Sequence, residues 1–144
     1  LTVKLQTVIT FPLGSGEIRT ERKILEMSNP QAEVVIDEYL TACYGTTEYA
    51  EDMTSLTLLA EKDGEKTELS YEYKCREAAV SGADRVSCKL PPIDTKVSLT
   101  CEGREKAGYF REGYAFSPMF TLGYHGKLRD KEEFVTWLKL EKAD

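Results

Sequence analysis

The chain has 144 residues, of which 41% are hydrophobic and 31% are charged, and its formal net charge is −6. This length and composition are those of one folded domain with its own core and argue against a disordered chain. The negative charge, without a stripe of Lys and Arg, argues against a nucleic-acid partner. The run at residues 34–36 is typical of the longest apolar runs, which are too short for a helix inserted in a membrane.

The first third of the chain has the alternating pattern of strands. Residues 1–11 place their apolar side chains on one face of an extended segment: Leu1, Val3, Leu5, Ile9 and Phe11. Turn residues follow at 12–16, and a less regular segment, 18–27, ends before Pro30. Residues 32–44 could form a helix, but their β-branched side chains favour a strand. In that strand Val35, Asp37 and Tyr39 share one face.

A β-hairpin is predicted from Thr54 to Lys74. Asp63-Gly64 is a preferred two-residue turn, because glycine accepts the positive φ that the turn requires. Counting outward from this turn sets oppositely charged residues against each other and places Leu58 opposite Leu69.

Two short strands, 84–90 and 95–102, are predicted next, followed by a segment rich in aromatic residues and glycine, 107–126. We expect His125 to lie in a turn after the last strand. A helix is predicted at 130–142, because Phe134, Trp137 and Leu138 share a face at helical spacing. The whole chain, 1–144, is therefore predicted to be a single mainly β domain: an antiparallel β-sandwich or a small barrel with a C-terminal helix.

The four cysteines predict two disulfides. The cysteines are Cys43, Cys75, Cys88 and Cys101, and their spacing includes no C-x-x-C pair. Because His125 is also the only histidine, a structural zinc site is not expected. Of the three possible pairings we favour Cys75–Cys88, which closes a short loop, and Cys43–Cys101, which joins an early strand to a late one. The alternative is that the thiols are free and buried.

Disulfides predict a secreted or extracellular protein, because they persist in oxidising compartments. The chain begins at Leu1 rather than at a methionine, which led us to expect a mature secreted form or an excised domain.

The sequence contains no pattern that predicts catalysis. No serine lies in a nucleophile elbow, the carboxylates are scattered, and 14–16 lacks the lysine of a phosphate-binding loop. We therefore expect no enzyme, no cofactor and no metal.

The aromatic residues are the best candidates for a binding site. Tyrosine and phenylalanine supply a large contact area at a low cost in side-chain entropy. The predicted anchors lie in the aromatic segment, with a second cluster near Cys43: Tyr109, Phe110, Tyr114, Phe116, Tyr44 and Tyr49. The competing interpretation is that the rings of the aromatic segment fill the core.

The function predicted from the sequence is non-catalytic binding of another macromolecule, with a protein as the expected partner, by an adhesion, receptor or immune-modulating domain. The alternative is a small β-barrel that carries an apolar small molecule, as lipocalins do. In that case the alternating side chains of the hairpin would line the cavity: Leu56, Leu58, Leu69 and Tyr71.

Overall fold

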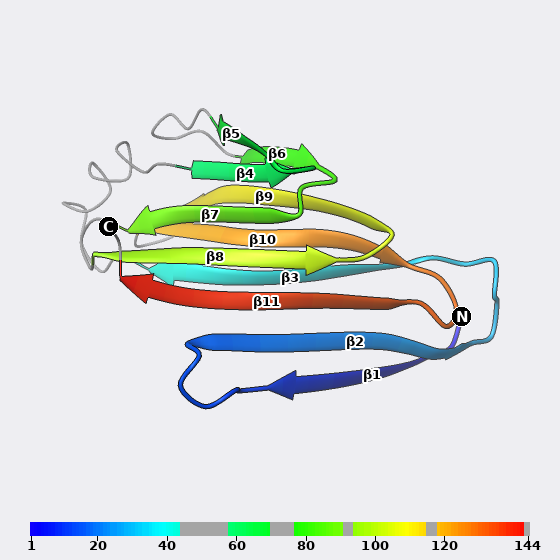
Figure 1. Cartoon of the computed structure of the whole chain (residues 1–144). Helices are drawn as coiled ribbons and strands as arrows, with labels where there is room; N and C mark the ends of the chain where they lie inside the picture. Colours follow the sequence, from blue (N-terminus) through cyan, green and yellow to red (C-terminus); the bar gives the residue numbers. More distant parts are fainter. Residues whose placement is uncertain (44–57, 70–76, 91–93, 115–117, 143–144) are drawn as a thin grey trace.

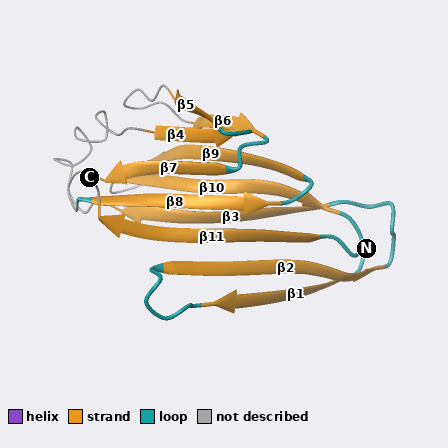
Figure 2. Ribbon diagram, viewed as in Figure 1, coloured by secondary structure: helices purple, strands orange, loops and turns teal. Residues whose placement is uncertain are grey.

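The computed structural model describes residues 1–43, 58–69, 77–90, 94–114 and 118–142 (Figures 1 and 2). The strands in this part of the chain are β1 (Val3–Thr10), β2 (Glu17–Met27), β3 (Val34–Cys43), β4 (Leu58–Lys62), β5 (Glu65–Leu69), β6 (Glu77–Ser81), β7 (Arg85–Leu90), β8 (Thr95–Glu102), β9 (Glu105–Tyr114), β10 (Pro118–Leu128) and β11 (Glu133–Lys142). They form a seven-stranded sheet in the order β1-β2-β11-β8-β7-β4-β5 and a four-stranded sheet in the order β3-β10-β9-β6.

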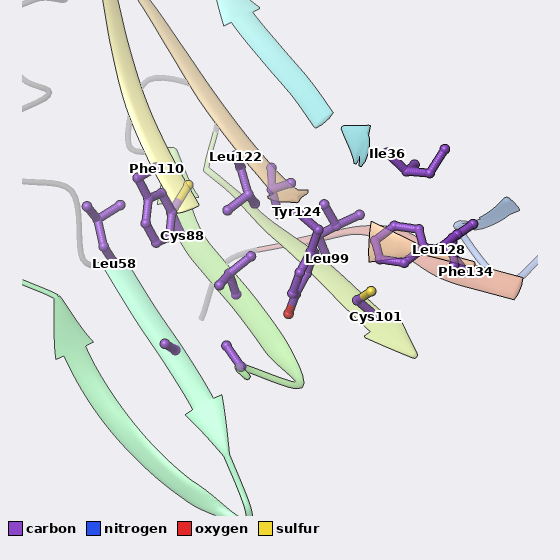
Figure 3. Packing of buried hydrophobic residues seen from close by; sticks show 14 of the residues in the cluster. Ile36, Leu58, Cys88, Leu99, Cys101, Phe110, Leu122, Tyr124, Leu128 and Phe134 are labelled. Carbon is purple, nitrogen blue, oxygen red and sulfur yellow. The ribbon is translucent and has the colours of Figure 1, made fainter. Parts of the chain in front are cut away.

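The two sheets lie face to face, and apolar side chains from both fill the space between them (Figures 1 and 3). Each of the largest core side chains is at most 1% exposed: Ile24, Leu58, Val86, Val97, Phe110, Leu122, Tyr124, Leu128 and Phe134. Neighbouring strands are antiparallel throughout the described ladders. The prediction of a mainly β fold with antiparallel pairing is therefore confirmed.

The predicted hairpin is present as β4 and β5, in the expected register. Leu58 pairs with Leu69, and Lys62 pairs with Glu65 next to the turn. Both turn residues have positive φ, 52° at Asp63 and 81° at Gly64. That backbone is typical of a two-residue turn whose twist matches the flanking strands. The outer pairs that we predicted, at Leu56 and Tyr71, lie outside the described residues.

The predicted C-terminal helix is wrong, because residues 133–142 form strand β11 and the described residues contain no helix (Figure 2). β11 lies inside the larger sheet and pairs with β2 on one side and β8 on the other. Its side chains alternate, with Phe134 turned into the core and Trp137 turned outward, where Arg19 lies 5.7 Å from its ring centre. Correspondingly, no membrane-spanning helix occurs in the described part.

Both predicted disulfides are also wrong, since each needs a thiol that the structure shows to be free. Cys88 on β7 and Cys101 on β8 are free and buried, with exposed fractions of 2% and 1%. They pack among apolar core side chains, where cysteine behaves as a small apolar residue. Cys75 and the side chain of Cys43 lie outside the described part. The four-cysteine count predicted pairing, but at Cys88 and Cys101 the alternative of buried thiols is the one observed.

These two thiols should be unreactive in the folded protein. Burial raises the pKa of both Cys88 and Cys101 to about 12, so the reactive thiolate is scarce at neutral pH. We expect iodoacetamide to leave both residues unmodified under native conditions and to alkylate both in denaturant without reductant. Peptide mass spectrometry resolves the two sites. Either cysteine found in a disulfide-linked peptide would contradict this assignment.

Candidate functional site

Strand β9 sends two adjacent aromatic residues to opposite faces of the four-stranded sheet. Phe110 points into the core between the sheets and is 1% exposed (Figure 3). Tyr109 is also covered, but its contacts are with residues on the other face of its sheet. This division follows from the period of two along a strand. We call the face that carries Tyr109 the outer face.

Three neighbouring strands build the centre of the outer face. In the register of the sheet, His125 of β10 lies beside Asp37 of β3, and Gly123 of β10 lies between Tyr39 of β3 and Tyr109 of β9. Side chains that are neighbours in this register on one face come within contact distance.

Tyr109 is held by three side chains on the outer face. Its ring stacks on His125, with ring centres 4.2 Å apart and planes 13° from parallel. The guanidinium carbon of Arg111 lies 5.0 Å from the ring centre, within the range of a cation–π contact. The hydroxyl donates a hydrogen bond to Oδ1 of Asp37 at 2.7 Å, and Nδ1 of His125 lies 3.4 Å from the same oxygen.

Gly123 makes this arrangement possible, because the Tyr109 ring lies where a side chain at position 123 would be. A Cβ on Gly123 would be 2.7 Å from both Cζ and the hydroxyl oxygen of Tyr109, and 2.8 Å from Cβ of Tyr39. Such distances are not tolerated between non-bonded atoms, so glycine is required for the ring to lie flat on the sheet.

The hydroxyl of Tyr109 is held in its protonated form. Burial, and then the hydrogen bond to Asp37, raise the pKa of the Tyr109 hydroxyl above its ordinary value, so it stays protonated at neutral pH. A protonated, hydrogen-bonded phenol is neither a base nor a nucleophile. The cluster is a platform made of the stacked rings of Tyr109 and His125, with the carboxylate of Asp37 at its edge.

Two residues of β3 present apolar surface beside this platform. Val35 is 65% exposed and Tyr39 is 58% exposed. A depression of about 470 Å³ lies beside Val35, and its lining includes Val35, Ser81, Arg104, Ala107, His125 and Lys127. The outer face therefore combines exposed apolar groups, a hollow and polar side chains.

A charge network borders the depression. Arg104 forms ion pairs with Glu33 at 2.9 Å and Glu132 at 3.0 Å, and also with Glu105. The hydrogen bond from Arg104 lowers the pKa of the Glu33 carboxyl. The pKa of Glu132 is lowered chiefly by the backbone N–H of Arg129 and then by Arg104. The network joins the turn between β8 and β9 to the residues just before β3 and β11, and the border carries both signs of charge.

The predicted site residues are only partly brought together. Tyr109 belongs to the outer face, where it supports its neighbours, whereas Phe110 belongs to the core, as the competing interpretation proposed. Tyr114 ends β9 opposite Pro118, but its side chain lies outside the described part. Tyr44, Tyr49 and Phe116 are also outside the described residues.

Sequence reasoning missed most of the outer face as a site. Val35, Asp37 and Tyr39 were placed on one face of a strand, which is confirmed, but nothing in the pattern marked that face as exposed. His125 was expected in a turn and lies within β10 instead. The charged neighbours Asp37 and Glu38 point to opposite faces of β3, so charge alone did not mark the face turned away from the core.

Comparisons with known proteins add information on the fold alone. No protein-family model matches the chain, and no curated protein matches it. Among solved structures, the crystal structure of the Slr1438 protein from Synechocystis sp. PCC 6803 is similar, with a TM-score of 0.57 and 9% sequence identity. The match covers 97% of this chain but 55% of the Slr1438 chain, so this chain spans about half the length of that protein.

Proposed function

We propose that this protein is a non-catalytic binding domain whose outer face binds another protein. The observation that carries the proposal is Tyr39, which is 58% exposed on a strand and lies beside the buried Tyr109 stack. An aromatic side chain on a rigid strand has little freedom to lose on binding, so its contact area contributes efficiently to affinity.

The surroundings of Tyr39 fit a protein partner. Asp37, Arg111 and Lys127 supply both signs of charge around the aromatic centre, as at the rim of a protein–protein interface. The nearby Val35 and the depression offer a place for an apolar side chain of the partner. Adhesion, receptor and immune-modulating domains are the classes that this proposal includes.

The proposal does not depend on a cellular location. A secreted location was predicted mainly from disulfides, and the free thiols of Cys88 and Cys101 remove that support. The alternative of an apolar-ligand carrier is not favoured either. Leu58, expected to line a cavity, is 1% exposed and packs in the core with Phe110 and other large side chains.

Removing the Tyr39 ring should weaken binding at the outer face. Peptides can be selected from a displayed random library against the immobilised wild-type protein and measured by calorimetry. We expect the selected peptides to bind Tyr39→Ala at least about tenfold more weakly than the wild type, because an aromatic anchor is lost.

Leu25→Ala is the control, because Leu25 is an exposed apolar residue, at 40%, and belongs to β2 in the other sheet. The affinity of the selected peptides for this variant should equal their affinity for the wild type. Selected peptides that bind Tyr39→Ala as tightly as the wild type would overturn the proposal, as would peptides that depend on Leu25 instead.

A further inference from the structure

Strand β1 is an edge strand with an exposed apolar row. It pairs with β2 alone, at one end of the seven-stranded sheet, and lies at the margin of the molecule (Figure 1). Leu5 and Ile9 on this strand are 46% and 53% exposed, and Phe11 beyond its end is 67% exposed. On β2, Leu5 pairs with Ile24 and Ile9 pairs with Thr20. Both of these β2 residues are buried, so the row lies on the core side of the larger sheet.

The row is exposed because the smaller sheet does not reach it. β3 is the last strand of that sheet on this side, and Arg22 of β2 forms an ion pair with Glu38 of β3 at 2.6 Å. This contact closes the side of the core. Beyond it, β1 has no strand of the smaller sheet over it in the described part of the chain.

Apart from one lysine and a bulge in its ladder with β2 at Lys4/Leu5, β1 has few of the features that keep edge strands from pairing with other chains. Natural edge strands commonly carry charges, proline or an inward-pointing charged residue. The opposite edge of the same sheet, β5, has three charged residues among five, Glu65, Lys66 and Glu68. β1 has one among eight, Lys4, which is already paired with Glu26 at 3.1 Å.

We propose that β1 pairs antiparallel with β1 of a second copy of this chain, about a two-fold axis at Thr7. This axis places Leu5 opposite the partner's Ile9, and Thr7 opposite the partner's Thr7. Opposed residues on one face of antiparallel strands interact directly, so each apolar side chain of the row meets another one.

The charges of β1 agree with this register. Lys4 faces the partner's Thr10, and the two copies of Lys4 are separated by six residues along the ladder, or about 20 Å. Moving the axis to Gln6 or Val8 would set Leu5 or Ile9 opposite the partner's Thr7, whereas the axis at Thr7 sets Leu5 and Ile9 opposite each other. The two seven-stranded sheets then form one continuous sheet, on a surface separate from the outer face.

The test uses opposite charges at the axis. Sedimentation velocity at micromolar concentrations should show a dimer for the wild-type protein and monomers for Thr7→Lys and for Thr7→Glu, because each variant sets like charges directly opposite each other. We expect the dimer dissociation constant to rise by about tenfold or more. Mixing the two variants in equal amounts should restore a dimer, which a loss of folding would not allow.

Thr67→Lys is the matched control, since Thr67 is an exposed threonine on the opposite edge strand, β5. It should remain dimeric. A Thr7→Cys variant should form a covalent dimer under mild oxidation, while Thr67→Cys should not. A monomeric wild type, a mixture of the charged variants that stays monomeric, or dissociation by Thr67→Lys would each overturn the proposal.

Discussion

Truncation of Phe110 to alanine should lower the free energy of unfolding by about 4 kcal/mol, the usual cost of removing a buried phenylalanine ring. Phe110 is 1% exposed and pairs with Leu122 in the middle of the four-stranded sheet, so the cavity would form where both sheets meet. Urea unfolding followed by circular dichroism measures the change. A loss of this size is a large part of the total stability of an ordinary domain.

Tyr39→Ala is the control for that result, because Tyr39 is an aromatic residue of the same sheet on the opposite face. With 58% of Tyr39 exposed, we expect its truncation to cost less than about 1 kcal/mol. If Tyr39→Ala destabilised the protein as much as Phe110→Ala does, the assignment of the two faces would be wrong.

A methyl group at position 126 should destabilise the protein by about 3 kcal/mol, through overpacking against Phe134. A Cβ on Gly126 would lie 2.1 Å from Cε2 of Phe134 and 2.6 Å from its Cδ2. The ring is 1% exposed between the sheets and has little room to move aside. Thermal and urea unfolding of Gly126→Ala measure the loss.

The same ring supplies a control for this substitution. A Cβ on Gly103 would approach Phe134 less closely, to 2.9 Å, so Gly103→Ala should cost clearly less than Gly126→Ala. In addition, Phe134→Leu should cost less in the Gly126→Ala background than in the wild type, because it removes the overlap. Additive costs would show that the ring is not the obstacle.

Local patterns in the sequence predicted a strand well where one of its faces is apolar and the other is polar. The hairpin of β4 and β5 follows from the turn at Asp63-Gly64 and from opposite charges beside it. β1 was visible because residues 1–11 alternate, apart from Thr7 and Val8. Neither prediction required knowledge of the rest of the molecule, since turn backbone and strand period are local properties.

The helix at 130–142 was predicted from a spacing of apolar residues that also fits the strand observed there. Phe134, Trp137 and Leu138 lie at helical spacing, but Phe134 and Leu138 also have the even spacing of a strand. The choice was decided by pairing with β2 and β8, which lie far away in the sequence. Tertiary pairing of this kind outweighs local helix propensity.

The cysteine and site predictions had a common weakness, because both needed the layout of the two sheets. An even number of cysteines does not say whether they point into the core, and Cys88 and Cys101 do. An aromatic segment does not say which of Tyr109 and Phe110 lies in the core and which lies under the outer face. Strand alternation separated the two residues, but only the packing of the sheets identified the face that is turned into the core.

The central claim is that the outer face binds a protein partner, and amide chemical-shift mapping tests it most directly. The ¹⁵N-labelled protein would be titrated with a peptide selected against it. We predict that the largest shifts fall on outer-face positions of β3, β9 and β10, including Asp37, Tyr39, Gly123 and His125, with little change on β11. Shifts centred on Trp137 and the rest of the seven-stranded sheet, with an unchanged β3, would contradict the account.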